Sequence, residues 1–188
     1  GTSLASHEVA QGYKEVSVDT VIVPMKKKDE DAYFLVWTTT PWTLLANVAL
    51  CVNPNEIYVK VESMGYKFIL AKALMNKVLG DDVKVLEEYT GKELEYTEYE
   101  QLLPFLEVDK KGFFVTCDEY VTMSDGTGVV HIAPAFGEDD ANVGKKYNLP
   151  YLNPVGEDGC YLEGPWKGRL VIDSELEVDI IKYLASED

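Results

Sequence analysis

The sequence predicts a mainly β domain, in which a barrel-like sheet is surrounded by peripheral α-helices. Short runs rich in β-branched and aromatic residues recur along the 188 residues and are separated by turn signals. These runs outnumber the helical ones and do not alternate regularly with them, which argues against a doubly wound parallel sheet. The composition, 46% hydrophobic and 27% charged, is that of an ordinary globular domain.

The first part of the chain is expected to form a β-hairpin. Apolar and polar residues alternate over residues 15–23, as in a half-buried strand. Pro24 and the charged run 25–31 predict a turn into a second strand over residues 32–38. Further strands are expected over residues 49–52, 57–61, 66–70, 83–88, 113–117 and 129–132.

Three helices are expected around this sheet. The first spans residues 71–79 and is closed by Gly80, and the second spans residues 138–147 after Gly137. The third begins near Ser174 as a possible cap. Its apolar residues recur every four positions: Leu176, Ile180 and Leu184.

Charge and cysteine content limit the classes of function. Residues 1–188 contain no repeat or linker and are expected to form a single domain, excised from or inserted in a larger chain. No apolar run approaches the roughly 20 residues that span a bilayer. The net charge of −16 opposes nonspecific affinity for nucleic acid, which depends on Lys and Arg. The cysteines contain no CxxC pair, which favours buried reduced thiols in a cytosolic protein: Cys51, Cys117 and Cys160.

The stretch WTTTPWTLLAN combines hydroxyls and indoles around one proline. Pro41 fixes its own φ and pushes Thr40 toward an extended conformation, so the strand is expected to end near Thr39 in a bend. Such a bend would expose threonine hydroxyls, with Trp42 as an apolar wall and Asn47 as a donor and acceptor. The alternative is a β-rich edge whose threonines bond only the backbone.

The stretch DGTGVVHIAPAFGEDDAN places a second polar group at a strand-to-helix turn. His131 lies in an apolar run that Pro134 breaks. Three acids follow in the first helical turn: Glu138, Asp139 and Asp140. Acids favour helix N-termini by about 0.3–1 kcal/mol each, which explains the acids but not the imidazole. A core histidine is the more common situation, and acid–base chemistry or half a metal site are the alternatives; metal ranks low because the only other histidine is His7.

Nucleotide-binding and hydrolase motifs are missing from the sequence. There is no GxGxxG after a strand, no GxxxxGK[ST] and no GxSxG elbow, so an ATP-dependent activity within these residues is unsupported. The acidic stretch GKELEYTEYEQLLPF, residues 91–105, is explained by solvated strand edges.

Taken together, WTTTPWTLLANVALCVNP and GTGVVHIAPAFGEDD resemble the editing domain of isoleucyl-tRNA synthetase, a connective insertion in that class I enzyme. EVAQGYKEVS, GKELEYTEYEQLLPF and LPYLNPVGEDGCY support the resemblance, which covers nearly the whole chain in the same order and spacing. TTTPWT is the specific phrase, because the valyl and leucyl relatives have an arginine in this segment. HIAPAFGEDD looks more like the eukaryotic cytosolic forms. The chain departs from the family at Leu45 and Ala46, where Pro-Ser is usual, and this affects the bend before Asn47.

The resemblance implies a distorted β-barrel that hydrolyses the ester of mischarged Val-tRNA(Ile) and rejects Ile-tRNA(Ile) by size. One missing methylene gives only roughly 10- to 200-fold discrimination, for which isoleucine against valine is the standard example. A second site must therefore remove valine. The parent enzyme ligates isoleucine to tRNA(Ile) with ATP and Mg, but that synthetic site lies outside these residues.

The resemblance also implies roles for individual residues. Asp140 would hold the α-ammonium of the substrate through a charge-assisted bond, and His131 would form the pocket wall that collides with isoleucine. Thr40 and Thr43 would act in catalysis beside Asp140 by positioning water, without a strong general base. Beside His131, the expected substrate-binding residues are Thr38, Thr39, Trp42, Asn47 and Ala133.

The expected partners are the aminoacylated 3′ end of tRNA(Ile) and the remainder of the synthetase, with no cofactor or metal in this domain. The domain would be a cytoplasmic monomer without membrane contact, and it should bind tRNA poorly by itself. The alternatives are a freestanding deacylase, the valyl or leucyl counterpart, an aminoacyl-binding module without turnover, and a protein-interaction domain that uses the acidic surface. The presence of Asp140 argues against lost activity. Hydrolysis of mischarged tRNA separates all of these.

Overall fold

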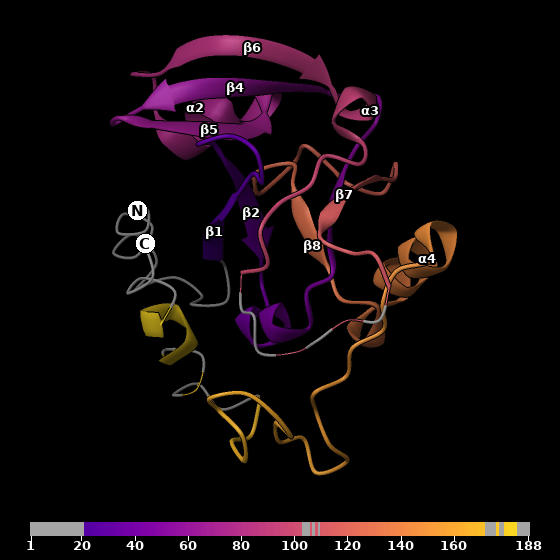
Figure 1. Ribbon diagram of the computed structural model, residues 1–188. Helices are drawn as coiled ribbons and strands as arrows, with labels where there is room; N and C mark the ends of the chain where they lie inside the picture. The colour runs from indigo at the N-terminus through magenta and orange to yellow at the C-terminus, as the bar shows by residue number, and fades with distance from the viewer. Residues whose placement is uncertain are drawn as a thin grey trace.

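One bent sheet forms the centre of the molecule. The computed structural model describes residues 21–102, 106, 108, 110–171, 176 and 179–183. The strands are β1 (Val21–Lys26), β2 (Tyr33–Thr38), β3 (Ala49–Val52), β4 (Ile57–Ser63), β5 (Tyr66–Ala71), β6 (Lys84–Thr90), β7 (Phe114–Cys117) and β8 (Val130–Ile132). Their order is β6-β4-β5-β2-β8-β3-β7, with β1 paired to β2. In Figure 1, β4, β5 and β6 run across the top of the other strands, so the sheet bends into a half-barrel and the expected mainly β fold is confirmed.

The expected hairpin is present, but its first strand extends beyond the predicted end at Val23 to Lys26. β1 pairs antiparallel with β2 along its whole length. Pro24, predicted to lie in the turn, is opposite Leu35 within this ladder instead. Among the described strands β1 pairs with β2 alone, and an edge strand tolerates a residue without an N–H. Residues 15–20 of the predicted strand lie outside the described residues.

The opposite edge of β2 is shared by two strands. β5 pairs in parallel with the beginning of β2, and β8 pairs with its end, where Trp37 lies opposite Val130. Between them the buried Thr127 donates its hydroxyl to the Leu35 carbonyl at 2.7 Å and accepts at its own carbonyl from the Ala71 amide at 2.9 Å. The end of β2 therefore lies beside β8.

The chain between β2 and β3 forms a 3-10 helix, η1 (Pro41–Ala46), which brings the threonine motif to β8. β3 then pairs antiparallel with β8, with Leu50 opposite His131, and in parallel with β7. The side chains of Leu44 and Leu45 hold η1 in place, since both are almost fully buried in the main hydrophobic cluster. Burial of one leucine is worth about 1.5–3 kcal/mol, so η1 is anchored firmly.

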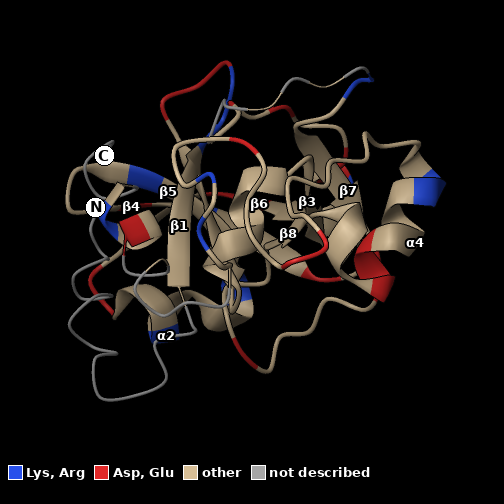
Figure 2. Ribbon diagram, turned by 90° about the horizontal axis from the view of Figure 1, so that it is seen from below, with Lys and Arg blue, Asp and Glu red and all other residues tan. Residues whose placement is uncertain are grey.

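Helices lie around the ends of this sheet. α4 (Glu138–Tyr147) has the predicted bounds, and Figure 2 shows acids at its first turn and lysines at its last, which suits the helix dipole. The predicted helix 71–79 is divided into the 3-10 turn η2 (Lys72–Leu74) and α2 (Met75–Leu79), which ends at Gly80. Leu176 and residues 179–183 are helical, whereas Ser174 and Leu184 of the predicted C-terminal helix lie outside the described residues.

The acidic stretch 91–105 begins with a helix rather than a strand edge. α3 (Gly91–Leu94) is fixed by a reciprocal capping box between Thr90 and Glu93. The Glu93 amide donates to the Thr90 hydroxyl at 3.3 Å, and the Thr90 amide donates to the Glu93 carboxylate at 2.8 Å. Residues 103–105 lie outside the described residues.

Two further findings bear on the class of protein. None of the described helices is long and apolar enough to cross a membrane. The three cysteines are free thiols, and Cys51 and Cys117 are buried.

Candidate functional site

The threonine motif forms a compact turn that is stabilised by its own hydroxyls. β2 ends at the buried Thr38, whose hydroxyl accepts from the Thr40 amide at 3.0 Å. Pro41 then begins η1, and Thr40 precedes it with a φ of −133°. The Thr43 hydroxyl donates to the Thr40 carbonyl at 2.8 Å and lies 3.0 Å from the Thr40 hydroxyl. The predicted bend is therefore present, although it is a helical turn.

Burial divides these threonines into two groups. The sequence predicts exposed hydroxyls, yet the side chains of Thr38, Thr43 and Asn47 are only about 4–5% exposed. Thr39 is exposed and Thr40 is half-buried. The buried members pack because η1 inserts its leucines into the core beneath them. Only the outer part of the motif thus meets solvent.

His131 joins the two motifs directly. Its Nε2 lies 2.9 Å from the Thr43 hydroxyl, and its Nδ1 lies 3.4 Å from the Asn47 amide nitrogen. The side chain is 8% exposed, and burial lowers the pKa of His131 to about 4. The imidazole is therefore neutral at pH 7 and serves as a hydrogen-bonding group within the domain.

Asp140, in α4, lies beside the end of β8, the strand that contains His131. The Ala133 amide, directly after β8, donates to Asp140 Oδ2 at 2.9 Å. Asp140 is half-buried in the first turn of α4, and this burial raises the pKa of its carboxyl. A Cβ at Gly137 would lie 3.1 Å from Asp140 Oδ1, so the glycine leaves space beside this second oxygen. Asp139, in contrast, is exposed.

An aromatic contact links the threonine motif to the segment before α4. The ring of Trp42 meets that of Phe136 edge to face, with centroids 5.2 Å apart. Phe136 belongs to η3 (Pro134–Phe136), the turn between β8 and α4. The Tyr161 hydroxyl donates to the Trp42 carbonyl. η1 and η3 therefore lie together, as do the two sequence motifs that contain them.

Sequence reasoning missed three residues that support this arrangement. Tyr99 donates its hydroxyl to Asn47 Oδ1 from the acidic stretch that the sequence predicts to be a solvated edge. Tyr99 is 2% exposed, and its burial raises the pKa of the phenol well above its usual value. Phe136 and Tyr161 are the other two. The sequence pattern does not distinguish these aromatics from ordinary core residues. The two tyrosines, for example, contact residues that are 52 or more positions away in the sequence.

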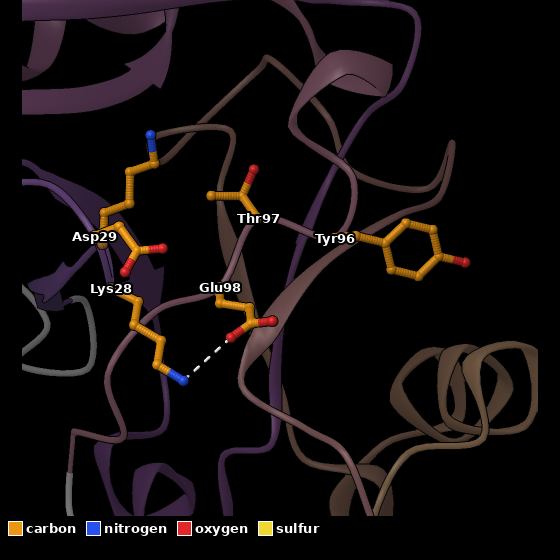
Figure 3. Close-up of a pocket in the computed structure, with 6 residues that line it drawn as sticks. Lys28, Asp29, Tyr96, Thr97 and Glu98 are labelled. Carbon is orange, nitrogen blue, oxygen red and sulfur yellow. Dashed lines mark hydrogen bonds and ion pairs between the residues drawn. The ribbon is translucent and has the colours of Figure 1, made fainter.

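Two surface hollows lie apart from these residues. The first, of about 450 Å³, contains the Lys28–Glu98 ion pair seen in Figure 3 and is lined by Lys27, Lys28, Asp29, Tyr96, Thr97 and Glu98. The second, of about 380 Å³, lies around Lys92, Glu95 and Tyr147. Neither is lined by a predicted site residue. Within the described ranges, no three His, Cys, Asp or Glu side chains are grouped so that they could hold a metal ion.

The chain is similar in sequence to part of isoleucine–tRNA ligases. It is 54% identical over 174 residues to the ligase of Clostridium novyi, covering 91% of this chain and 17% of the relative. It is 50% identical to that of Clostridium acetobutylicum and 46% identical to that of Picrophilus torridus, in each case over 98% of this chain and 18% of the relative. The chain thus spans less than a fifth of these relatives. No protein-family model matches it.

Solved structures share its fold. GlLeuRS-CP1 superposes with a TM-score of 0.66 at 16% identity, covering 99% of this chain and 89% of that one. The editing domain of the P. knowlesi cytosolic leucyl-tRNA synthetase gives a TM-score of 0.66 at 12% identity, covering 89% and 93%. These likenesses establish an editing-domain fold. The predicted eukaryotic cytosolic type is not confirmed, since the sequence relatives are mostly bacterial.

Proposed function

Because the chain is homologous over nearly its whole length to part of isoleucine–tRNA ligases, we propose that it is their editing domain and hydrolyses Val-tRNA(Ile). The observation that carries the proposal is the contact of Thr43 with His131, which unites the two motifs of the family resemblance in one place. The fold shared with leucyl-tRNA synthetase editing domains supports the same assignment.

Discrimination by size requires such a site. A synthetic pocket that admits isoleucine also admits valine, and one missing methylene gives roughly 10- to 200-fold discrimination, isoleucine against valine being the standard example. A second, smaller pocket accepts the valyl ester and excludes isoleucine. In this proposal the wall of that pocket includes His131, which contacts Thr43 and Asn47, and Trp42, which packs against Phe136.

The proposed reaction is hydrolysis of an ester by a positioned water. Asp140 binds the α-ammonium of the substrate through the carboxylate oxygen beside Gly137, where no side chain fills the space, because the Ala133 amide bonds the other oxygen. Thr40 orients the water and the ester, and Thr43 supports Thr40 through the contact between their hydroxyls. A burial-lowered pKa keeps His131 neutral, so it donates or accepts hydrogen bonds. Orientation and polarisation supply several kcal/mol without a dedicated base, with help from the free ribose hydroxyl of the tRNA.

The proposal extends to partners and conditions. The substrate is the aminoacylated 3′ end of tRNA(Ile), delivered by the remainder of the ligase chain, and the domain acts as part of a monomer in the cytoplasm. It needs neither a cofactor nor a metal; ATP and Mg serve the synthetic site of the parent ligase.

The test is deacylation by a full-length ligase that contains this segment. Val-tRNA(Ile) should be hydrolysed and Ile-tRNA(Ile) spared, and Asp140→Ala should abolish the difference by stopping hydrolysis. Hydrolysis should survive a chelator when monovalent salt or polyamine maintains the tRNA fold. A wild-type ligase that spares both charged tRNAs would refute the proposal, and activity restored only by zinc would refute the metal-free reaction.

A leucyl or valyl counterpart is the second candidate, and the solved structures with the same fold are leucyl-tRNA synthetase editing domains. Identity to them is 12–16%, against 46–54% to isoleucine–tRNA ligases, which favours the isoleucyl assignment. Hydrolysis of mischarged tRNA(Leu) or tRNA(Val) but not Val-tRNA(Ile) would reverse this preference. Binding of a valyl-adenosine mimic without turnover would indicate a non-catalytic module.

A further inference from the structure

A buried chain of hydrogen bonds runs from Tyr99 through Asn47 and His131 to the threonines. We infer that Asn47 holds His131 in its Nε2–H tautomer and thereby turns the Thr40 hydroxyl into a hydrogen-bond acceptor for the substrate side of the site. Asn47 and Tyr99 are then positioning residues. The functional consequence rests on the proposed deacylase, whereas the tautomer itself does not.

The orientation of the Asn47 amide is determined by two neighbours. Asn47 Nδ2 lies 2.9 Å from the Ala49 carbonyl, which can only accept. Asn47 Oδ1 accepts from the Tyr99 hydroxyl, a donor that stays protonated because burial raises the pKa of Tyr99. A flipped amide would place two carbonyl oxygens against each other. The nitrogen therefore faces Ala49 and His131.

This orientation fixes the proton of the imidazole. An amide nitrogen carries two hydrogens, and one of them is used by Ala49. The other points to His131 Nδ1 at 3.4 Å, so Nδ1 accepts. Since the buried His131 is neutral, its single N–H must be on Nε2, from which it donates to the Thr43 hydroxyl at 2.9 Å.

The threonine hydroxyls follow from this assignment. Thr43 has one hydrogen, and the Thr40 carbonyl at 2.8 Å takes it. The two lone pairs of the Thr43 hydroxyl accept from His131 and from the Thr40 hydroxyl, which lies 3.0 Å away. The hydrogen of Thr40 is thus directed inward, and its lone pairs remain for a water or an ammonium group outside.

The number of hydrogen bonds that each side chain makes within the protein separates residues that support the site from residues that can contact the substrate. Every polar side-chain atom of Asn47 has a protein partner, and Asn47 and Thr43 are about 4% exposed. Half-buried Thr40 is the outer member of the chain. Asn47 and Thr43 therefore act through His131 and Thr40, rather than by touching substrate as the family resemblance implies.

Nitrogen-15 NMR of the 188-residue chain with labelled imidazoles tests the inference. The sequence has only two histidines, and loss of a signal in His131→Gln identifies His131. We expect an unprotonated Nδ1 and a protonated Nε2 at neutral pH. In Asn47→Asp, a carboxylate oxygen replaces the amide nitrogen that faces His131 Nδ1. The proton should then lie on Nδ1, and the Nδ1 signal should move to the chemical shift of a protonated nitrogen. A protonated Nδ1 in the wild type would overturn the inference, even if Asn47→Asp does not fold.

Tyr58→Phe is the control for the loss of a buried hydrogen-bonding group elsewhere in the core. The fully buried Tyr58 hydroxyl donates to the Gly128 carbonyl and accepts from the Asn53 amide, and neither of these groups is a hydrogen-bond partner of His131. Its tautomer signals should match the wild type, whereas equal changes in Tyr58→Phe and Asn47→Asp would overturn the specific role of Asn47. In the full-length ligase, Asn47→Asp should lower kcat for Val-tRNA(Ile) deacylation at least tenfold. A wild-type ligase without deacylation refutes the proposed function and leaves the tautomer decided by NMR.

Discussion

At the scale of single residues, the proposed function gives one carboxylate oxygen of Asp140 a structural bond to Ala133 and the other a bond to the substrate. Asp140→Asn keeps an oxygen for the Ala133 amide but removes the charge. A hydrogen bond to a charged group contributes about 1.5–3 kcal/mol, so deacylation of Val-tRNA(Ile) should fall roughly ten- to hundredfold. Initial rates of the full-length ligase under single-turnover conditions measure this fall.

The neighbouring Asp139→Asn is the control for that substitution. It removes the same charge from the same helical turn, but Asp139 is exposed. Asp139→Asn should lower the free energy of unfolding by the roughly 0.3–1 kcal/mol typical of a helix-dipole interaction, and deacylation should change little. If Asp139→Asn were the inactive variant and Asp140→Asn edited normally, the assigned roles would be wrong.

His131 provides the second prediction at this scale. His131→Ala removes a ring that Thr43 and Asn47 hold in place, which should enlarge the pocket. The ligase should then hydrolyse correctly charged Ile-tRNA(Ile), at a rate that approaches the rate on Val-tRNA(Ile). Thermal melts check that the variant is folded. Strict selectivity for valine in a folded His131→Ala ligase would show that other residues form the wall.

At the scale of elements, the turn before β8 determines how closely β8 approaches β2. Gly126 has a φ of +76°, and a Cβ there would lie 2.6 Å from the ring of Trp37. Gly126→Ala should therefore be destabilising through both backbone strain and overlap, by roughly 2–4 kcal/mol in total. The free energy of unfolding from urea titration measures it.

Gly65→Ala separates the two causes. Gly65 has a φ of +85°, but no atom lies within 4 Å of its Cβ position. Only the backbone term remains, about 1–2 kcal/mol. Equal losses in the two variants would mean that the Trp37 ring moves away without cost.

The strands were accessible to sequence reasoning for a simple physical reason. A short apolar run is a local signal, and the run over residues 49–52 located β3 at its observed bounds. The strand through Pro24 was not predictable, because tolerance of a missing N–H depends on β1 being paired, among the described strands, with β2 alone. The capping box of α3 was in the sequence as T-x-x-E but was masked by the surrounding acids.

The candidate site divides in the same way. Its motif residues could be named from the sequence, and the contact of Thr43 with His131 joins them. The burial of these residues could not be predicted from the sequence, because it depends on leucines of η1 entering the core. Tyr99 was invisible for a similar reason: its role exists only once the chain places it against Asn47.

At the scale of the whole molecule, the net charge of −16 leads to a prediction about tRNA, the partner in the proposed function. The isolated chain should bind tRNA(Ile) far more weakly than the full-length ligase, because phosphate affinity comes from released counterions at Lys and Arg. Fluorescence titrations at several salt concentrations measure both. Tight binding by the isolated chain with a steep salt dependence would contradict this expectation.

The sharing of β2 between β5 and β8 also sets the order in which the domain forms. Thr43 and His131 are 88 residues apart, whereas β1, β2, β4, β5 and β6 pair mostly with close neighbours in the chain. At 5–20 residues per second, a ribosome needs on the order of ten seconds to make the intervening segment. Distant pairings also form more slowly than local ones. A nascent chain is therefore expected to fold its hairpins first and to join Thr43 to His131 only later.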